Sequence, residues 1–171
     1  MAFPQDILTR AATIRLVTFD VDGVLTDGKL HYTSAGEEIK SFHARDGAAI
    51  KLLVDSGIHV ALISGRSSPA VSRRANELGI RHVYQNAGDK LAALADLSGK
   101  TGVEAAGTAH VGDDLPDLPL LGAVGLAIAV ADAQSAVRRA ADYVTITPGG
   151  EGAAGEVCTL VLTAQDKWPH V

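Results

Sequence analysis

Short apolar runs recur along the chain, and stretches with helical spacing separate them. The runs are continuous rather than alternating, as in parallel strands that are buried on both faces. They occupy residues 14–19, 58–63, 81–85, 108–112, 125–130 and 143–146. This pattern predicts an α/β fold, a Rossmann-like three-layer sandwich in which helices cover both faces of a mostly parallel sheet.

Three of the separating stretches carry apolar residues at helical spacing. This spacing predicts which face of each helix packs against the sheet. The predicted faces are Ile50, Leu53 and Val54; Leu91, Leu94, Ala95 and Leu97; and Val157, Leu160 and Val161.

One segment does not fit this alternation of strands and helices. From about residue 28 to 42, polar and apolar residues alternate with period two about Gly36, which predicts a β-hairpin inserted after the first strand. An isolated two-stranded ribbon is only marginally stable. The hairpin is therefore either a surface decoration or a lid or oligomer contact that another surface covers.

Composition narrows the class of protein. A length of 171 residues fits a single domain over residues 1–171, and no repeat suggests a second. The longest apolar run, 119–131, is too short for a membrane span, and the N-terminus lacks an export signal, so we expect a cytoplasmic protein. A net charge of −5 argues against a nucleic acid or an anionic membrane as partner. Cys158, the only cysteine, excludes an internal disulfide and is expected to be buried.

Polar residues follow the first four predicted strands, where an open parallel sheet binds its ligands. They are Asp20, Asp22, Ser64, Arg66, Asp89, Lys90, Asp113, Asp114 and Asp117. Two carboxylates about 4 Å apart repel by roughly 4 kcal/mol at an effective dielectric near 20, so gathering Asp20, Asp22 and Asp113 requires a cation. Oxygen ligands without Cys or paired His select a hard ion, and this set suits Mg²⁺ better than Ca²⁺.

A Mg²⁺ ion here would let a phosphate dianion approach an aspartate, so that an aspartyl-phosphate can form. Ser64 then offers a hydroxyl to a phosphoryl oxygen, and Lys90 supplies positive charge, as phosphoryl transfer requires. Singly, these residues could be turn, cap or surface residues, but their order at successive strand ends favours the catalytic interpretation. Asp114 and Asp117 stay open between a supporting role in the site and stabilisation of the following helix.

Four motifs resemble those of the haloacid dehalogenase (HAD) superfamily of phosphatases: "DVDGVLTDG", "ISGR", Lys90 and "GDDLPD". The resemblance implies a HAD-like fold in which Asp20 is the nucleophile. It implies that Asp22 protonates the leaving oxygen and later activates the attacking water. It also implies that Mg²⁺ is held by the carboxylates of Asp20 and Asp113 and by the backbone carbonyl of Asp22.

The whole chain also resembles a capless subfamily, the 3-deoxy-D-manno-octulosonate 8-phosphate (KDO 8-phosphate) phosphatases, through "TFDVDGVLTDG", "FHARDGAAIKLL", "SGRSSPAV" and "GDDLPDLPLL". This resemblance implies hydrolysis of a phosphorylated 3-deoxy sugar acid in lipopolysaccharide precursor synthesis. It implies a homotetramer whose hairpins form a central barrel and close neighbouring active sites. The implied substrate contacts are Asp22, His43, Ala44, Arg45, Asp46, Gly47, Lys51, Arg66, Arg74 and Lys90. Two positions depart from the pattern, with His43 in place of a small polar residue and Gly155 in place of a common arginine.

Basic residues gather around these motifs in an otherwise acidic chain: Arg45, Lys51, Arg66, Arg73 and Arg74. Since Mg²⁺, Ser64 and Lys90 already serve the phosphate, the extra cations favour a second anion on the substrate, such as a carboxylate. Arg73 and Arg74 could equally be solvated helix residues. The segment "ARDG" combines charge with a turn glycine, Gly47. The histidines on predicted strands, His59, His82 and His110, are expected to be packed.

Three alternatives remain. The substrate could be a nine-carbon, sialic-acid-like 9-phosphate. The chain could be a receiver-like signalling module, although such a module carries adjacent acids rather than the spacing of Asp20 and Asp22. The chain could also be an inactive assembly subunit of another enzyme, although the motif residues would then have no evident use.

Overall fold

A computed structural model describes residues 3–169 and contains the predicted sheet. Six parallel strands lie in the order β5, β4, β1, β6, β7, β8. Their bounds are β1 Leu16–Phe19, β4 His59–Ile63, β5 His82–Tyr84, β6 Thr108–Gly112, β7 Leu126–Ala129 and β8 Tyr143–Val144. Phe19 of β1 pairs with Leu62 on one side and Val111 on the other, so the carboxyl ends of the central strands meet at one edge.

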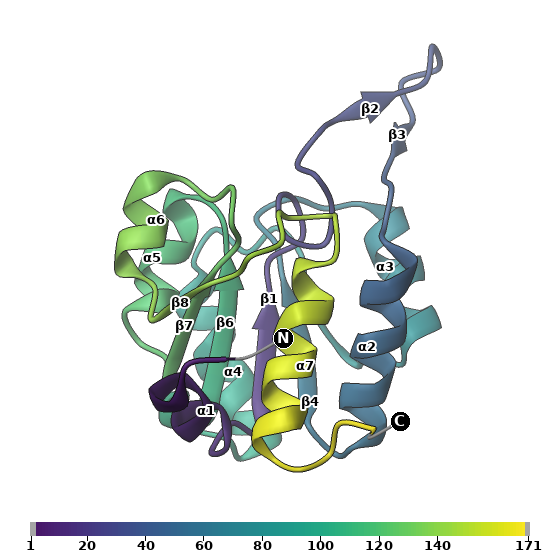
Figure 1. The fold of residues 1–171 in the computed structure, drawn as a ribbon. Coiled ribbons are helices and arrows are strands. Elements are labelled where there is room, and N and C mark those ends of the chain that lie inside the picture. The colour runs from purple at the N-terminus through teal and green to yellow at the C-terminus, as the bar shows by residue number, and fades with distance from the viewer. Residues whose placement is uncertain (1–2, 170–171) are drawn as a thin grey trace.

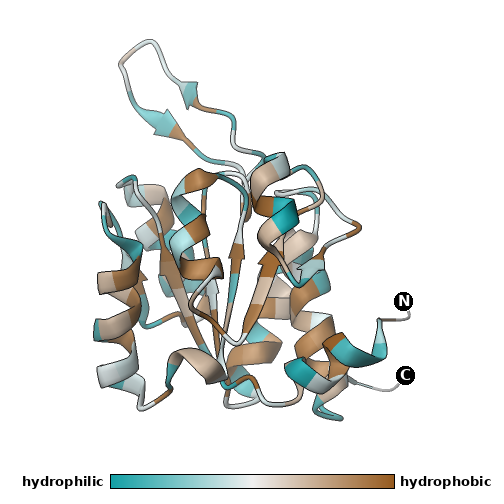
Figure 2. Cartoon of the chain, turned by 90° about the vertical axis from the view of Figure 1, so that its left-hand side faces the viewer, coloured by the Kyte–Doolittle hydropathy of each residue, from teal (hydrophilic) through white to brown (hydrophobic). Residues whose placement is uncertain are grey.

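Helices cover both faces of this sheet. Helices α1, α2 and α7 lie on one face, and α4 lies on the other (Figure 1). The helices are α1 Gln5–Ala11, α2 Ala44–Asp55, α3 Pro69–Leu78, α4 Lys90–Thr101, α5 Leu118–Leu121, α6 Ser135–Ala140 and α7 Ala153–Ala164, with 3₁₀ turns η1 Ala105–Gly107 and η2 Leu115–Asp117. Figure 2 shows the hydrophobic strands enclosed between these layers. The predicted three-layer α/β sandwich is confirmed.

The main core lies between the sheet and the covering helices. Val17, Phe19 and Ile128 are fully buried in it, and each such side chain contributes about 1.5–3 kcal/mol of hydrophobic stabilisation. Cys158 is also fully buried, as predicted. None of the helices within residues 3–169 combines the length and the apolar character needed to cross a bilayer.

The predicted helix faces are confirmed for α2 and α7 but not for α4. Leu94 and Leu97 of α4 are buried, whereas Leu91 is 41% exposed and Ala95 is exposed. The buried stripe starts from Lys90, which is drawn inward at the first position of the helix. A stripe that starts at Lys90 continues at i+3, i+4 and i+7, so position 91 turns toward solvent.

The predicted hairpin is present and projects beyond the carboxyl edge of the sheet (Figure 1). Its strands are β2 His31–Tyr32 and β3 Glu38–Ile39, and His31 lies opposite Ile39. Apolar side chains remain uncovered on it, with Leu30 46%, Tyr32 58% and Ile39 54% exposed. The hairpin therefore offers a surface that a further molecule could cover.

Candidate active site

The polar residues predicted to meet at the carboxyl ends of the strands line one cavity of about 330 Å³. It is lined by Asp20, Asp22, Ser64, Gly65, Arg66, Ala87, Gly88, Lys90, Asp113, Asp114, Pro116 and Asp117. Eight of the nine polar residues that followed the predicted strands are among them, and the ninth, Asp89, instead caps α4. The parallel sheet brings them together because each one follows a strand that ends at the same edge.

The turn after β1 packs directly against the acid from β6. The backbone N–H of Asp20 donates to the carbonyl of Val111 at 3.0 Å, which extends the pairing of β1 with β6 beyond Phe19. Gly23 then adopts a φ of +97°, and a Cβ atom there would lie 2.1 Å from Oδ2 of Asp113. Only glycine allows both this conformation and this close approach.

The acidic residues form a group that could hold a cation. One carboxylate oxygen from each of Asp20, Asp113 and Asp117 lies within 4.8 Å of the others. Oδ1 of Asp113 is buried and has no hydrogen-bond partner among the described residues. A buried oxygen without a partner is costly unless a ligand satisfies it, so this group fits a hard cation such as Mg²⁺.

Asp117 is already engaged by other groups. Its Oδ1 accepts from Nζ of Lys90 at 2.6 Å and lies 3.0 Å from Nε2 of His110. Its Oδ2 accepts the backbone N–H of Asp113 at 3.0 Å. Asp20 and Asp113 are therefore the better candidates for the cation, and Asp117 supports Lys90 and the backbone beside them.

The proton affinities in this group reflect burial and mutual repulsion. Burial, followed by the charges of Asp20 and Asp117, raises the pKa of Asp113 to about 8. Burial and Asp117 also raise the pKa of Asp20, against the opposing effect of Lys90. Burial disfavours the charged form of Asp117 as well, but the hydrogen bond with His110 and the Lys90 ammonium hold its pKa below its usual range. Without a cation, Asp20 and Asp113 therefore both hold a proton more tightly than an ordinary aspartate.

This repulsion predicts the effect of Asp113→Asn on stability. The pKa of Asp113 in the folded chain is above its ordinary value of 3.8, so this residue costs the metal-free protein stability as the pH rises toward about 8. We expect the substitution to raise the metal-free Tm at pH 8 by at least about 2 °C, and by less at pH 5. Mg²⁺ should raise the Tm of the unaltered protein but not that of the variant. Thermal unfolding with chelator or Mg²⁺ measures both effects, and an equal Mg²⁺ response in the two proteins would contradict the assignment.

Lys90 is the central cation of the site. It is only 6% exposed, and its Nζ lies 3.0 Å from Oδ1 of Asp20 and 2.6 Å from Oδ1 of Asp117. Burial opposes its charge, but these two carboxylates raise the pKa of Lys90, so it stays protonated at neutral pH. Asp89 caps the helix that carries it by accepting the N–H of Ala92 at 3.1 Å. The start of α4 thus fixes Lys90 against the end of β1.

The other predicted residues of this cavity differ in what they contact. Ser64 is buried, and its Oγ accepts the N–H of Arg66 at 3.2 Å, which leaves its own hydrogen free to donate. Asp114 accepts the N–H of Leu115 at 2.7 Å and Nε2 of Gln134 at 2.6 Å. Asp114 therefore acts as a cap of η2, the simpler of its two interpretations.

His110 contacts the site from beneath, a role that was not predicted from the sequence. His110 is fully buried in β6, opposite Thr18 of β1, and its Nδ1 lies 2.8 Å from the Thr18 hydroxyl. With Nδ1 accepting from Thr18, Nε2 can donate to Asp117. A signal existed in the sequence, because a histidine inside a fully buried strand just before an acidic motif needs polar partners.

Most of the expected substrate contacts lie outside this cavity in a single chain. Within it are Asp22, Arg66 and Lys90. His43, Arg45 and Asp46 line a separate hollow of about 290 Å³ between α2 and α7. Ala44 lines a further hollow with residues of α3, and Lys51 is exposed on α2.

The hollow between α2 and α7 carries buried polar atoms that have no hydrogen-bond partner within residues 3–169. They are Nδ1 of His43 and Oδ2 of Asp46, while Oδ1 of Asp46 accepts the N–H of Gly155 at 2.7 Å. Burial raises the pKa of Asp46. Trp168, near the end of the described chain, lines the same hollow and packs against the core of its own chain.

The prediction that Gly47 is a turn glycine is wrong. Gly47 lies in the first turn of α2 and is buried. A Cβ atom there would lie 2.1 Å from Nη2 of Arg74, whose guanidinium lies 5.8 Å from the centre of the Phe42 ring. Glycine at this position makes room for Arg74 between α2 and α3, whereas Arg73 is exposed and pairs with Glu77.

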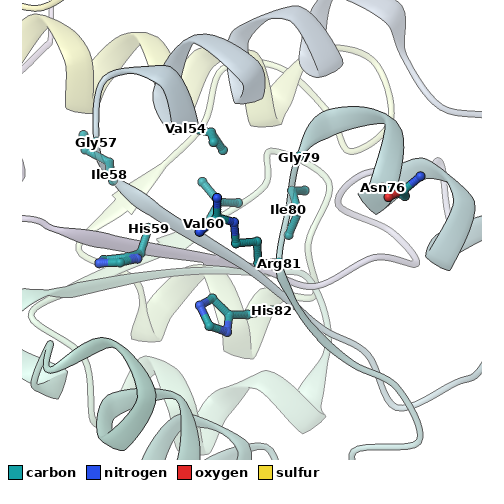
Figure 3. Close-up of a pocket in the computed structure, with 10 residues that line it drawn as sticks. All are labelled: Val54, Gly57, Ile58, His59, Val60, Asn76, Gly79, Ile80, Arg81 and His82. Carbon is teal, nitrogen blue, oxygen red and sulfur yellow. The ribbon is translucent and has the colours of Figure 1, made fainter.

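A hollow of about 800 Å³ lies at the opposite, amino edge of the sheet (Figure 3). His59 and His82, the first residues of β4 and β5, line it together with Arg81. Among the residues that the structure describes, no acidic one lines this hollow, so it does not provide the chemistry of the carboxyl edge. The prediction that His59 is packed is wrong, because the start of β4 is open to solvent; His82 is half-buried.

Comparisons with known proteins agree with this geometry. A sequence model of the haloacid dehalogenase-like hydrolases matches residues 80–155. The 3-deoxy-D-manno-octulosonate 8-phosphate phosphatase of Yersinia pestis is 48% identical over 163 residues, which cover 95% of this chain and 87% of that protein. The phosphatase of the same name from Haemophilus influenzae is 50% identical over 154 residues, covering 90% and 86%.

A solved structure gives the same result. The 3-deoxy-D-manno-octulosonate 8-phosphate phosphatase of Moraxella catarrhalis, in complex with a magnesium ion, a phosphate ion and KDO, has a TM-score of 0.94 and 44% identity. The match covers 97% of this chain and 95% of that one. The chain therefore belongs to the 3-deoxy-D-manno-octulosonate 8-phosphate phosphatase family of haloacid dehalogenase-like hydrolases.

Proposed function

We propose that this chain is a Mg²⁺-dependent phosphatase that hydrolyses KDO 8-phosphate to KDO and phosphate. One observation carries the chemistry: two acids after β1, a third after β6 and a buried lysine line a single cavity. The family supports the choice of substrate, since the relative from Moraxella catarrhalis was solved with magnesium, phosphate and KDO.

The residues of the cavity can perform the reaction in two displacements. A carboxylate oxygen of Asp20 attacks phosphorus, the bond from phosphorus to the sugar oxygen breaks, and Asp22 gives that oxygen a proton. Asp22 then takes a proton from water, whose oxygen attacks the aspartyl-phosphate and frees phosphate from Asp20. Lys90, 3.0 Å from Asp20, and Ser64 stabilise the charge on the phosphoryl oxygens.

A cation held by residues already described would support these two displacement steps. The carboxylates of Asp20 and Asp113 and the backbone carbonyl of Asp22 would hold Mg²⁺. When bound, Mg²⁺ supplies positive charge that reduces the repulsion between the phosphate and Asp20.

A substrate panel tests the proposed function. Phosphate release is measured with Mg²⁺ on KDO 8-phosphate, a sialic-acid-like nine-carbon 9-phosphate, and neutral sugar phosphates of similar length. We expect a higher kcat/KM on the two sugar acids than on the neutral esters, because Arg66 in the cavity provides a cation beyond those that serve the phosphate. Between the two acids, the family relatives favour KDO 8-phosphate. A higher kcat/KM on the nine-carbon ester would mean that this ester, and not KDO 8-phosphate, is the substrate. Indifference to the substrate carboxylate would contradict the role given to the basic residues, and a stable phospho-form without turnover would indicate a receiver.

The proposal also covers the oligomeric state, the domain organisation and the location of the protein. A homotetramer whose hairpins form a central barrel is supported by the exposed apolar residues Leu30, Tyr32 and Ile39. A single domain over residues 1–171 is supported by the hydrophobic cluster that extends from Ile7 to Leu162. The cytoplasmic location stays a prediction.

A further inference from the structure

The base of the hairpin carries a lysine that reaches the candidate active site. Lys40 directly follows β3, and the pairing of His31 with Ile39 orients the strand that leads to it. Its side chain is only 2% exposed, although the hairpin projects from the body of the protein (Figure 1). A buried ammonium group costs several kcal/mol unless opposite charges accompany it. The burial of Lys40 therefore depends on its partners.

Those partners are two carboxylates from different segments. Nζ of Lys40 contacts Oδ1 of Asp22 and lies 3.1 Å from Oε1 of Glu38. Arg66 completes the group, with Nη2 2.5 Å from Oε2 of Glu38 and Nε 3.7 Å from Oδ2 of Asp22. Two cations thus balance two anions, and the hairpin is joined to the loops that follow β1 and β4.

These contacts distinguish the two oxygens of Asp22. Lys40 holds Oδ1 by a charge-assisted hydrogen bond, the stronger class of such bonds. No described residue donates a hydrogen bond to Oδ2, and Nε of Arg66 lies beyond hydrogen-bond distance from it. Lys40 therefore orients the carboxylate through one oxygen and leaves the other available.

We propose that Lys40 is a positioning residue for Asp22 and that the hairpin delivers it. With Lys40 in place, Oδ2 of Asp22 is oriented for proton transfer to the leaving oxygen, and Glu38 keeps Lys40 and Arg66 beside it. The inference rests on the proposed function, because it depends on Asp22 being the proton donor. It gives the hairpin a role within its own subunit, besides any contact with neighbouring subunits.

A comparison of leaving groups tests this role. An alkyl phosphate must receive a proton as its oxygen leaves, whereas p-nitrophenolate leaves without one. For Lys40→Met, we expect kcat/KM to fall about tenfold to hundredfold on an alkyl phosphate and by less than about threefold on p-nitrophenyl phosphate. The loss on the alkyl phosphate should lie in kcat, with KM nearly unchanged, and Lys40→Arg should restore part of it.

A second hairpin lysine provides the matched control. Lys29 is 72% exposed and pairs with Asp27, so Lys29→Met should leave both activities unchanged. Equal losses on the two substrates in Lys40→Met would indicate a general structural effect and overturn the proposal. No loss on the alkyl phosphate, or a loss confined to KM, would also overturn it. Any alkyl phosphate that the unaltered protein hydrolyses serves here, so this test can fail independently of the proposed KDO 8-phosphate substrate.

Discussion

Replacing Asp20 by Asn is expected to abolish phosphate release, with kcat reduced by about 10⁴-fold or more, because the amide oxygen cannot replace the carboxylate as nucleophile. The folded structure should persist. Asp20 lies against Asp113 and Asp117, so removing its charge relieves repulsion in the metal-free protein. Steady-state phosphate release with Mg²⁺, together with thermal unfolding, measures both outcomes.

The matched control for this variant is Asp27→Asn. Asp27 lies in the same motif but pairs with the exposed Lys29 and does not line the cavity. Its replacement should leave turnover within about twofold, as is usual for a surface substitution. Substantial turnover by Asp20→Asn would exclude Asp20 as the nucleophile.

Replacing Lys90 by Met is expected to reduce both stability and activity. The substitution keeps much of the side-chain volume but leaves Asp20 and Asp117 buried without their cation. Breaking a buried ion pair in this way costs about 3–5 kcal/mol. In a chain of this length, such a loss lowers the Tm by about 6–20 °C. Phosphate release should also fall, because the charge beside the nucleophile is lost.

Lys100→Met is the control on the same helix. Lys100 is 54% exposed and pairs with Asp96 one turn away, and such surface pairs contribute about 0–1 kcal/mol. Differential scanning calorimetry of the two variants provides the comparison. If Lys90→Met unfolds at the same temperature as Lys100→Met, then Lys90 is not the cation that neutralises the buried acids.

The parts of the fold that follow local rules could be predicted from the sequence. Continuous apolar runs identified all six parallel strands, because the four central strands are buried along almost their whole length and carry few polar residues. The carboxyl ends of parallel strands share one edge, so the order of Asp20, Ser64, Lys90 and Asp113 along the chain was sufficient to place them in one cavity.

Other features depend on tertiary contacts that no local pattern records. The buried acids attract Lys90 into the core-facing stripe of α4. Because Lys90 occupies this stripe, Leu91 faces solvent. Gly47 looked like a turn residue, but it lies within α2, where its missing side chain accommodates Arg74.

The hairpin could also be predicted only in part. Its strands followed from period-two alternation, but the return of Lys40 to Asp22 depends on how the hairpin leaves the sheet. The separation of His43, Arg45 and Asp46 from the active-site cavity likewise depends on how α2 packs against α7. Neither packing arrangement is visible in hydrophobic periodicity.

The central claim is that Asp20 becomes covalently joined to phosphorus during turnover. A crystal structure of the protein with Mg²⁺ and beryllium fluoride, which imitates a phosphoryl group, tests this claim most directly. We expect a fluoroberyllate bonded to a carboxylate oxygen of Asp20, with the cation between Asp20 and Asp113 and Lys90 beside the fluorides. An adduct on any other residue would contradict the claim.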